Sequence, residues 1–104
     1  MNNVKTINPK AFKDCVALST VIGLDKVQTI GDNCFVNTAL TTVDLSSAET
    51  LSADSFAYCP QLDTIILGKG LKNLGSGVFR STPITSIDFS ACSVLTTIPF
   101  CAFE

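Results

Sequence analysis

A phenylalanine recurs through the whole chain every 21 to 24 residues, and this repeat constrains the fold more than any other feature of the sequence. The members of this column are Phe12, Phe35, Phe56, Phe79 and Phe103. Further apolar columns keep the same register, five and eight residues before each phenylalanine. One repeat cannot bury its own apolar stripe, whereas stacked repeats can, so the columns predict a continuous core shared by consecutive repeats.

Each repeat also contains a segment of the form Leu-x-x-Ile-x-Leu, as in residues 62–67. Its alternating, β-branched end has the period of a strand. The repeat therefore predicts parallel strands at residues 18–22, 40–45, 62–67 and 84–89. The Phe-containing segments between them are expected to be extended or turn-like, because no window holds an amphipathic helix longer than about two turns.

A longer period of 44 residues lies over the first one. Residues 12–46 and 56–90 align without a gap and share 11 of 35 residues. At one inward position, where the other repeats have Leu45, Leu67 and Phe89, the first repeat has Gly23. We expect this glycine to require a local adjustment of the chain.

The complete frame of the repeat is Leu-x-x-Ile-x-Leu followed by Leu-x-x-Ile-Gly-x-x-Ala-Phe-x-x-Cys, and residues 11–15, 27–35 and 55–59 are close to it. This frame resembles the Treponema-type (BspA-like) leucine-rich repeat, over essentially the whole chain. The resemblance implies an α/β-class leucine-rich repeat solenoid, mostly β and loop with little helix. It would be a right-handed coil of about four 21–24-residue repeats, with a parallel sheet on its concave side.

The same resemblance implies a function. Proteins of this family are typical of the surfaces of bacteria and some protozoan parasites, where they attach to host or neighbouring-cell proteins. The chain is therefore expected to be a non-enzymatic protein-binding module of cell-surface or extracellular location, active in adhesion or recognition. The alternative is a structural spacer within a longer surface solenoid, without a ligand of its own.

Residues 1–104 are expected to form a single domain, because the chain is too short for two. No capping segment is visible at either end, which leads us to expect a fragment of a longer array. A terminal coil without a cap would present apolar side chains and unpaired strand edges, so self-association through it is also expected.

The five cysteines are expected to be structural. Cys15 and Cys59 occupy the slot three residues after phenylalanine, facing loop backbone inside the coil, and lie two coils apart, so their Cα atoms would be ~10 Å from each other, too far for a disulfide. Cys34 is expected in the core. Cys92 and Cys101 stand in the irregular last repeat, where the sequence leaves open whether they are free or paired.

The outward positions of the predicted strands form the candidate partner-binding surface. One column consists of hydroxyl side chains and the next alternates between isoleucine and aspartate. We name this surface the Thr/Ile/Asp face, and its residues are Thr20, Ile22, Thr42, Asp44, Thr64, Ile66, Ser86 and Asp88. Exposed isoleucines on a sheet are the candidate contact points for a partner. A catalytic role for the aspartates is not expected, because nothing on an open, wet face would raise the pKa of one of them.

Composition excludes several other functions. The net charge is −2 and the basic residues are dispersed, so no nucleic-acid surface is expected. No apolar run approaches the ~20 residues of a membrane helix, and residues 1–12 lack the apolar region of a signal peptide. There is no histidine and no Cys-x-x-Cys, so we expect no enzyme, no metal site and no cofactor.

Overall fold

The computed structural model describes residues 4–84, 87–95, 98–99 and 102 of the 104-residue chain. In this part of the chain, short strands and loops predominate and there is a single turn of 3-10 helix, η1, so the prediction of a mostly β structure with little helix is confirmed. The elements in chain order are β1 (Thr6–Ile7), η1 (Leu24–Lys26), β2 (Thr29–Ile30), β3 (Thr42–Leu45), β4 (Thr50–Leu51), β5 (Thr64–Leu67) and β6 (Asn73–Leu74).

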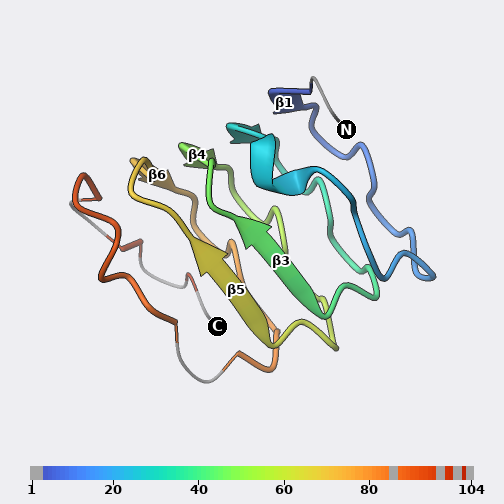
Figure 1. Ribbon diagram of the computed structural model, residues 1–104. Coiled ribbons are helices and arrows are strands. Elements are labelled where there is room, and N and C mark those ends of the chain that lie inside the picture. The colour runs from blue at the N-terminus through green and yellow to red at the C-terminus, as the bar shows by residue number, and fades with distance from the viewer. Residues whose placement is uncertain (1–3, 85–86, 96–97, 100–101, 103–104) are drawn as a thin grey trace.

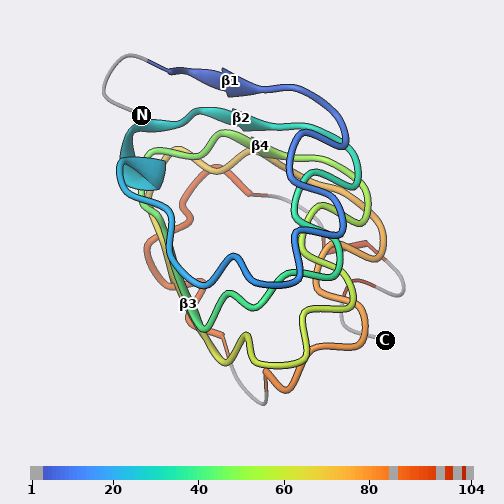
Figure 2. The same ribbon diagram turned by 90° about the vertical axis from the view of Figure 1, so that its right-hand side faces the viewer.

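These strands form two parallel sheets (Figure 1). One has four strands in the order β1-β2-β4-β6, and the other pairs β3 with β5. Paired residues stand 21 to 23 positions apart, as in Thr29 with Thr50 and Thr42 with Thr64. We call each pass of the chain around the interior, one repeat long, a coil. Figure 2 shows that successive coils overlap around a shared interior.

The four-stranded sheet is a structural element that the sequence did not single out. Its strands are only two residues long, so they lack the alternating run by which a strand is usually identified. Their inward residues are the apolar column five positions before each phenylalanine: Ile7, Ile30, Leu51 and Leu74. Gly31 and Gly75 follow two of these strands, and a Cβ atom on Gly75 would lie 2.3 Å from the backbone nitrogen of Ala53. Glycine therefore allows neighbouring coils to pack closely here.

Two of the four predicted long strands differ from the structure. Residues 18–22 form no strand, because Gly23, at φ 90°, turns the chain into η1. Leu24 is buried as a result, next to β3, and supplies the apolar side chain that Gly23 lacks. The described residues of 84–89 are also not a strand, and residues 85–86 lie outside the described part of the chain. The predicted strands at 40–45 and 62–67 are confirmed in parallel register.

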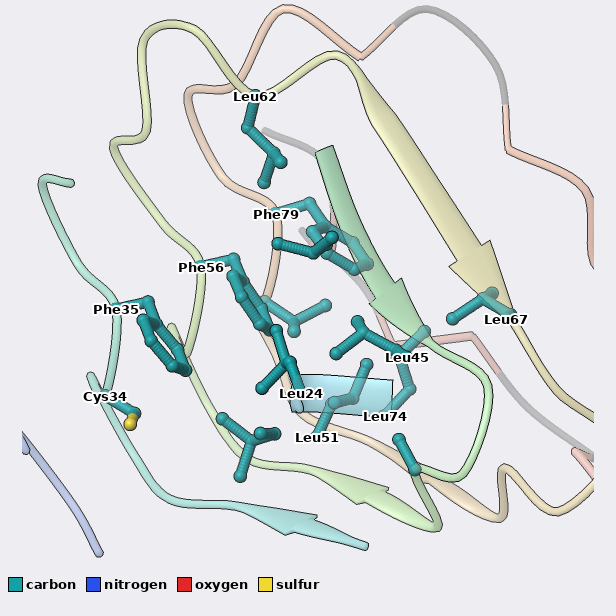
Figure 3. Close-up of a cluster of buried hydrophobic side chains, with 14 of the residues drawn as sticks. Leu24, Cys34, Phe35, Leu45, Leu51, Phe56, Leu62, Leu67, Leu74 and Phe79 are labelled. Atoms are coloured by element: carbon teal, nitrogen blue, oxygen red, sulfur yellow. The ribbon is translucent and has the colours of Figure 1, made fainter. Parts of the chain in front are cut away.

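The phenylalanine column forms a continuous stack in the core (Figure 3). The ring centroids of Phe35 and Phe56 are 5.2 Å apart, and those of Phe56 and Phe79 are 5.9 Å apart. These three rings are fully buried, as predicted. The prediction was wrong for Phe12, which is only partly buried, because its ring stacks on Phe35 alone. Phe103 lies outside the described residues.

Left-handed backbone conformations frame each phenylalanine of this stack. The residues two positions before and two positions after it have positive φ, between 55° and 67°. Asparagine, aspartate and glycine, which tolerate this region best, hold five of the eight positions. In addition, the amide of each phenylalanine donates to a carbonyl of the next coil, as Phe35 does to Ser55 at 2.8 Å. The Phe-containing segment is therefore a repeated turn held by its own ladder of hydrogen bonds. The eight residues are Lys10, Asp14, Asn33, Asn37, Asp54, Tyr58, Gly77 and Ser81.

The slot three residues after phenylalanine faces backbone only where a coil precedes it. Cys59 is fully buried and its thiol donates to the carbonyl of Phe35. Cys15 was predicted to lie inside the coil in the same way, but it is exposed, because no earlier coil supplies a carbonyl in the described structure. Cys34 is buried in the core, as predicted.

Candidate functional site

The centre of the Thr/Ile/Asp face lies on the two-stranded sheet. Alternation along β3 points Val43 and Leu45 into the core and leaves Thr42 and Asp44 exposed. In the neighbouring strand β5, Thr64 pairs with Thr42, and Ile66 pairs with Asp44. Both residues of β5 are exposed, and Ile66 keeps 47% of its surface accessible. The predicted hydroxyl column and the predicted Ile–Asp neighbours are therefore brought together on one surface.

The segments on either side of this sheet extend the same face. Residues 18–23 run beside β3, and residues 87–92 run beside β5 (Figure 1). Thr20 and Ile22 are exposed, and Ile22 has 80% of its surface accessible. Asp88 is exposed on the other side. Ser86, the remaining predicted residue of the face, lies outside the described residues.

Both aspartates of the face also hold the backbone at a corner of their coil. The amide of Ser46 donates to Asp44 Oδ1 at 3.0 Å, and the amide of Ser90 donates to Asp88 Oδ1 at 2.8 Å. Hydrogen bonds from the side chain and the backbone of Ser90 lower the pKa of Asp88 below its ordinary value of 3.8. Asp88 is therefore ionised at neutral pH, which leaves it unsuited to act as a general acid.

The difference between Ile66 and the aspartates of the two neighbouring coils goes with two ways of making this corner. Coils with Asp-x-Ser close it by the side-chain hydrogen bond. The β5 coil has Ile66 in place of the aspartate and Gly68 in place of the serine, and a Cβ atom on Gly68 would lie 1.9 Å from the carbonyl oxygen of Ser46. A corner without the aspartate leaves the outward position free for an apolar residue.

Charge on this face is of one sign. The segments 18–24, 40–46, 62–68 and 84–90 contain three aspartates, Asp44, Asp63 and Asp88, and no lysine or arginine. Among the described residues, the ion pairs that the structure shows lie elsewhere, between Lys72 and Glu49 and between Arg80 and Asp54. The carboxylates of the face therefore have no positive neighbour within ion-pairing distance in this part of the chain.

A second polar surface, which the sequence reasoning missed, covers the four-stranded sheet. Thr6, Thr29, Thr50 and Asn73 occupy equivalent positions there, and Asn73 Nδ2 donates to Thr50 Oγ1 at 3.3 Å. A shallow groove of about 350 Å³ runs over β4 and β6. The sequence did contain a signal for this surface. The residue just before each member of the apolar column Ile7, Ile30, Leu51 and Leu74 is threonine in three repeats and asparagine in the fourth.

Neither surface has the donors of a metal centre. The described residues include no group of three or more His, Cys, Asp or Glu side chains placed to hold an ion. The thiols of Cys15, Cys34, Cys59 and Cys92 are free, and Cys101 lies outside the described residues. In the same part of the chain, no helix has the length and apolar character needed to cross a membrane.

Comparison with protein families agrees with this geometry. A family model described as a BspA type leucine rich repeat region, present in 6 copies, matches residues 1–104. Searches of curated proteins and of solved structures found no match to the chain.

Proposed function

Since the chain belongs to the BspA-type leucine-rich repeat family over its whole length, we propose that it is a cell-surface adhesion or recognition module that binds a protein through the Thr/Ile/Asp face. Leucine-rich repeats commonly mediate protein–protein interactions and are generally non-enzymatic. In this proposal the chain is one right-handed solenoid domain of about four repeats, and the two-stranded sheet lies on its concave side.

The observation that carries this proposal is the exposure of Ile22 and Ile66. Leu24 in the coil of Ile22 and Leu62 and Leu67 in the coil of Ile66 are buried, so these coils had other apolar residues with which to fill the core. An isoleucine side chain that stays in water contributes no hydrophobic stabilisation to the fold. Burial of the same side chain by a partner would release the ordered water around it and favour binding. The exposed carboxylates of Asp44 and Asp88 add polar specificity at the rim of such a contact.

The alternative is the structural spacer without a ligand. The uniform Thr42–Thr64 row favours it, because hydroxyl side chains are common on a well-formed, solvated sheet. The two proposals differ in one respect that can be measured: only binding makes adhesion depend on the side chains of the face.

We would test this with beads that carry the purified chain, applied to a monolayer of host epithelial cells. Binding predicts adhesion above that of albumin-coated beads, loss of adhesion after the cells are treated with protease, and a reduction of at least severalfold for Ile66→Asp. The matched control is Thr50→Asp, which adds the same charge to the four-stranded sheet. Adhesion that neither protease nor Ile66→Asp reduces would contradict a protein partner at this face and favour the spacer.

A further inference from the structure

The pattern of the Thr/Ile/Asp face points to one class of partner, and we infer that this face takes a cationic amphipathic α-helix of another protein, lying across the strands. This inference rests on the proposed function and narrows it. It assigns the isoleucines to apolar side chains of the helix and the aspartates to its lysines or arginines.

Charge complementarity is the first argument. The four segments of the face carry three aspartates and no basic residue, whereas the equivalent segments of the four-stranded sheet, 4–8, 27–31, 48–52 and 71–75, carry two lysines and one glutamate. On that second sheet, Glu49 is paired with Lys72, with a separation of 3.8 Å between Nζ and Oε1. The carboxylates of Asp44 and Asp88 each use Oδ1 for a backbone amide. A carboxylate has about four acceptor sites, so both side chains can accept further hydrogen bonds from a cation supplied by a partner.

Spacing across the coils is the second argument. Isoleucine and aspartate alternate from coil to coil across the face, in the order Ile22, Asp44, Ile66 and Asp88. Asp44 and Ile66 are in direct register. Asp44 and Ile66 stand on paired parallel strands, which lie ~4.8 Å apart. Ile22 and Asp88 stand on the coils to either side, and the stacked phenylalanine rings of successive coils are 5.2, 5.2 and 5.9 Å apart. With these steps between coils, the four positions fall at about 0, 5, 10 and 16 Å. A helix rises ~1.5 Å per residue, so its residues i, i+3, i+7 and i+10 fall at about 0, 4.5, 10.5 and 15 Å on one side.

An extended strand in the same orientation would not match. Its side chains on one face repeat every ~7 Å, so they would be out of step with the coils after the second position. A helix with an apolar residue at i and i+7 and a basic residue at i+3 and i+10 meets all four positions. The short hydroxyl side chains of Thr42 and Thr64 leave the surface beside them low enough for a helix to approach.

The probe for this inference is an 18-residue, alanine-based helical peptide with leucine, lysine, leucine and lysine at the first, fourth, eighth and eleventh positions of one face. A second peptide has glutamate at the two lysine positions, and a third moves the lysines to the opposite face. Binding of each fluorescently labelled peptide to the whole chain is measured by anisotropy at 0.05 M and 0.5 M salt. We expect the first peptide to bind at least tenfold more tightly than either of the others at low salt, and to lose most of that advantage at high salt.

Variants of the chain locate the site. Asp44→Asn with Asp88→Asn keeps the acceptor for each serine amide and removes only the charges, and we expect binding to weaken about five- to twentyfold, as for two exposed ion pairs. Ile66→Thr should weaken it about fivefold through lost apolar contact. Glu49→Gln removes the same kind of charge from the other sheet and should change binding less than twofold.

Equal binding of the lysine and glutamate peptides to the unaltered chain would overturn the inference, and so would unchanged binding by the double asparagine variant. If the lysine peptide does not bind while bead adhesion still depends on Ile66, the helical partner is wrong and the proposed function stands. If adhesion also fails to depend on Ile66, both are wrong.

Discussion

The thiol of Cys59 donates a hydrogen bond to the backbone carbonyl of Phe35, 3.1 Å away and 24 residues earlier in the chain. It thereby ties the loop of one coil to the stacked-ring segment of the coil before it. The Thr38 hydroxyl lies 3.4 Å from the same sulfur, so two members of one sequence column meet in the interior. The preference of this slot for cysteine or threonine is thus a preference for a small side chain that can donate.

Replacement of Cys59 tests this role. Cys59→Ala removes the donor from a fully buried site and leaves the Phe35 carbonyl without it, so we expect a loss of about 1–3 kcal/mol in the free energy of unfolding. Cys59→Ser keeps a donor and should lose less. Urea denaturation followed by circular dichroism measures both. Cys15→Ala, at the exposed member of the column, is the control and should change stability by less than about 0.5 kcal/mol; equal losses at the two sites would show that the hydrogen bond contributes nothing.

The phenylalanine stack provides a second prediction. Phe56 has a ring on each side, so Phe56→Ala should lower the free energy of unfolding by about 3–5 kcal/mol. Phe12→Ala should lower it by less, because that ring is partly exposed and stacks on one neighbour only. Thr64→Ala, on the outer face, should cost less than about 1 kcal/mol. A Thr64 loss as large as that of Phe56 would show that the inner and outer faces of the coil are assigned wrongly.

Close packing between coils provides a third prediction. In Gly75→Ala the new methyl group would lie 2.3 Å from a backbone nitrogen, and backbone cannot move aside as a flexible side chain can. We expect a loss of about 1–3 kcal/mol, as for other overpacked sites. Gly70→Ala is the matched control, because its nearest neighbour would be the Glu49 side chain at 3.9 Å, an ordinary contact. Thermal unfolding of the two variants compares them directly, and a control as unstable as Gly75→Ala would show that close packing between coils is not the cause.

Much of this fold could be predicted because the repeat places chemically equivalent residues in equivalent surroundings. The inward columns, the buried rings of Phe35, Phe56 and Phe79, and the outward pair Asp44 and Ile66 all follow from position within the repeat. A residue of a stacked repeat meets its own counterpart in the next coil, so a column in the sequence becomes a contact in space.

The errors lie where one coil departs from its neighbours. Residues 18–22 were predicted to be a strand by analogy with residues 40–45, but Gly23 allows a left-handed turn, and burial of Leu24 in η1 replaces the missing apolar contact. The column also suggested that Cys15 is buried like Cys59, although burial depends on a preceding coil.

The structural part played by the aspartates was not predictable from their column alone. Asp44 and Asp88 were singled out as outward residues of the face, and their hydrogen bonds to Ser46 and Ser90 appear only in the folded corner. The serine two residues after each aspartate is the signal that could have indicated such a turn.

The buried thiol of Cys34 gives a pH-dependent prediction. Burial raises the pKa of Cys34 from 9.0 to about 11, although hydrogen bonds from the backbone of Phe12 and Ala11 act in the opposite direction. Because the folded chain holds this proton more tightly than the unfolded chain, the contribution of Cys34 to stability is complete below pH 9 and falls as the pH rises to about 11. The change is at most about 3 kcal/mol.

Cys34→Ala is the variant that isolates this effect, since alanine occupies the same column at Ala11 and Ala102 and fits the site. The difference in free energy of unfolding between the unaltered chain and this variant should be constant from pH 7 to 9 and shrink between pH 9 and 11. The two proteins share every other ionisable group, so the contributions of those groups cancel in this difference. At pH 8, iodoacetamide should modify the exposed Cys15 within minutes and leave Cys34 unmodified until the chain unfolds, because the thiolate is the reactive form and Cys34 is both protonated and inaccessible. Equal modification of the two thiols in the folded protein, measured by mass spectrometry of peptides, would contradict burial of Cys34 against the first coil.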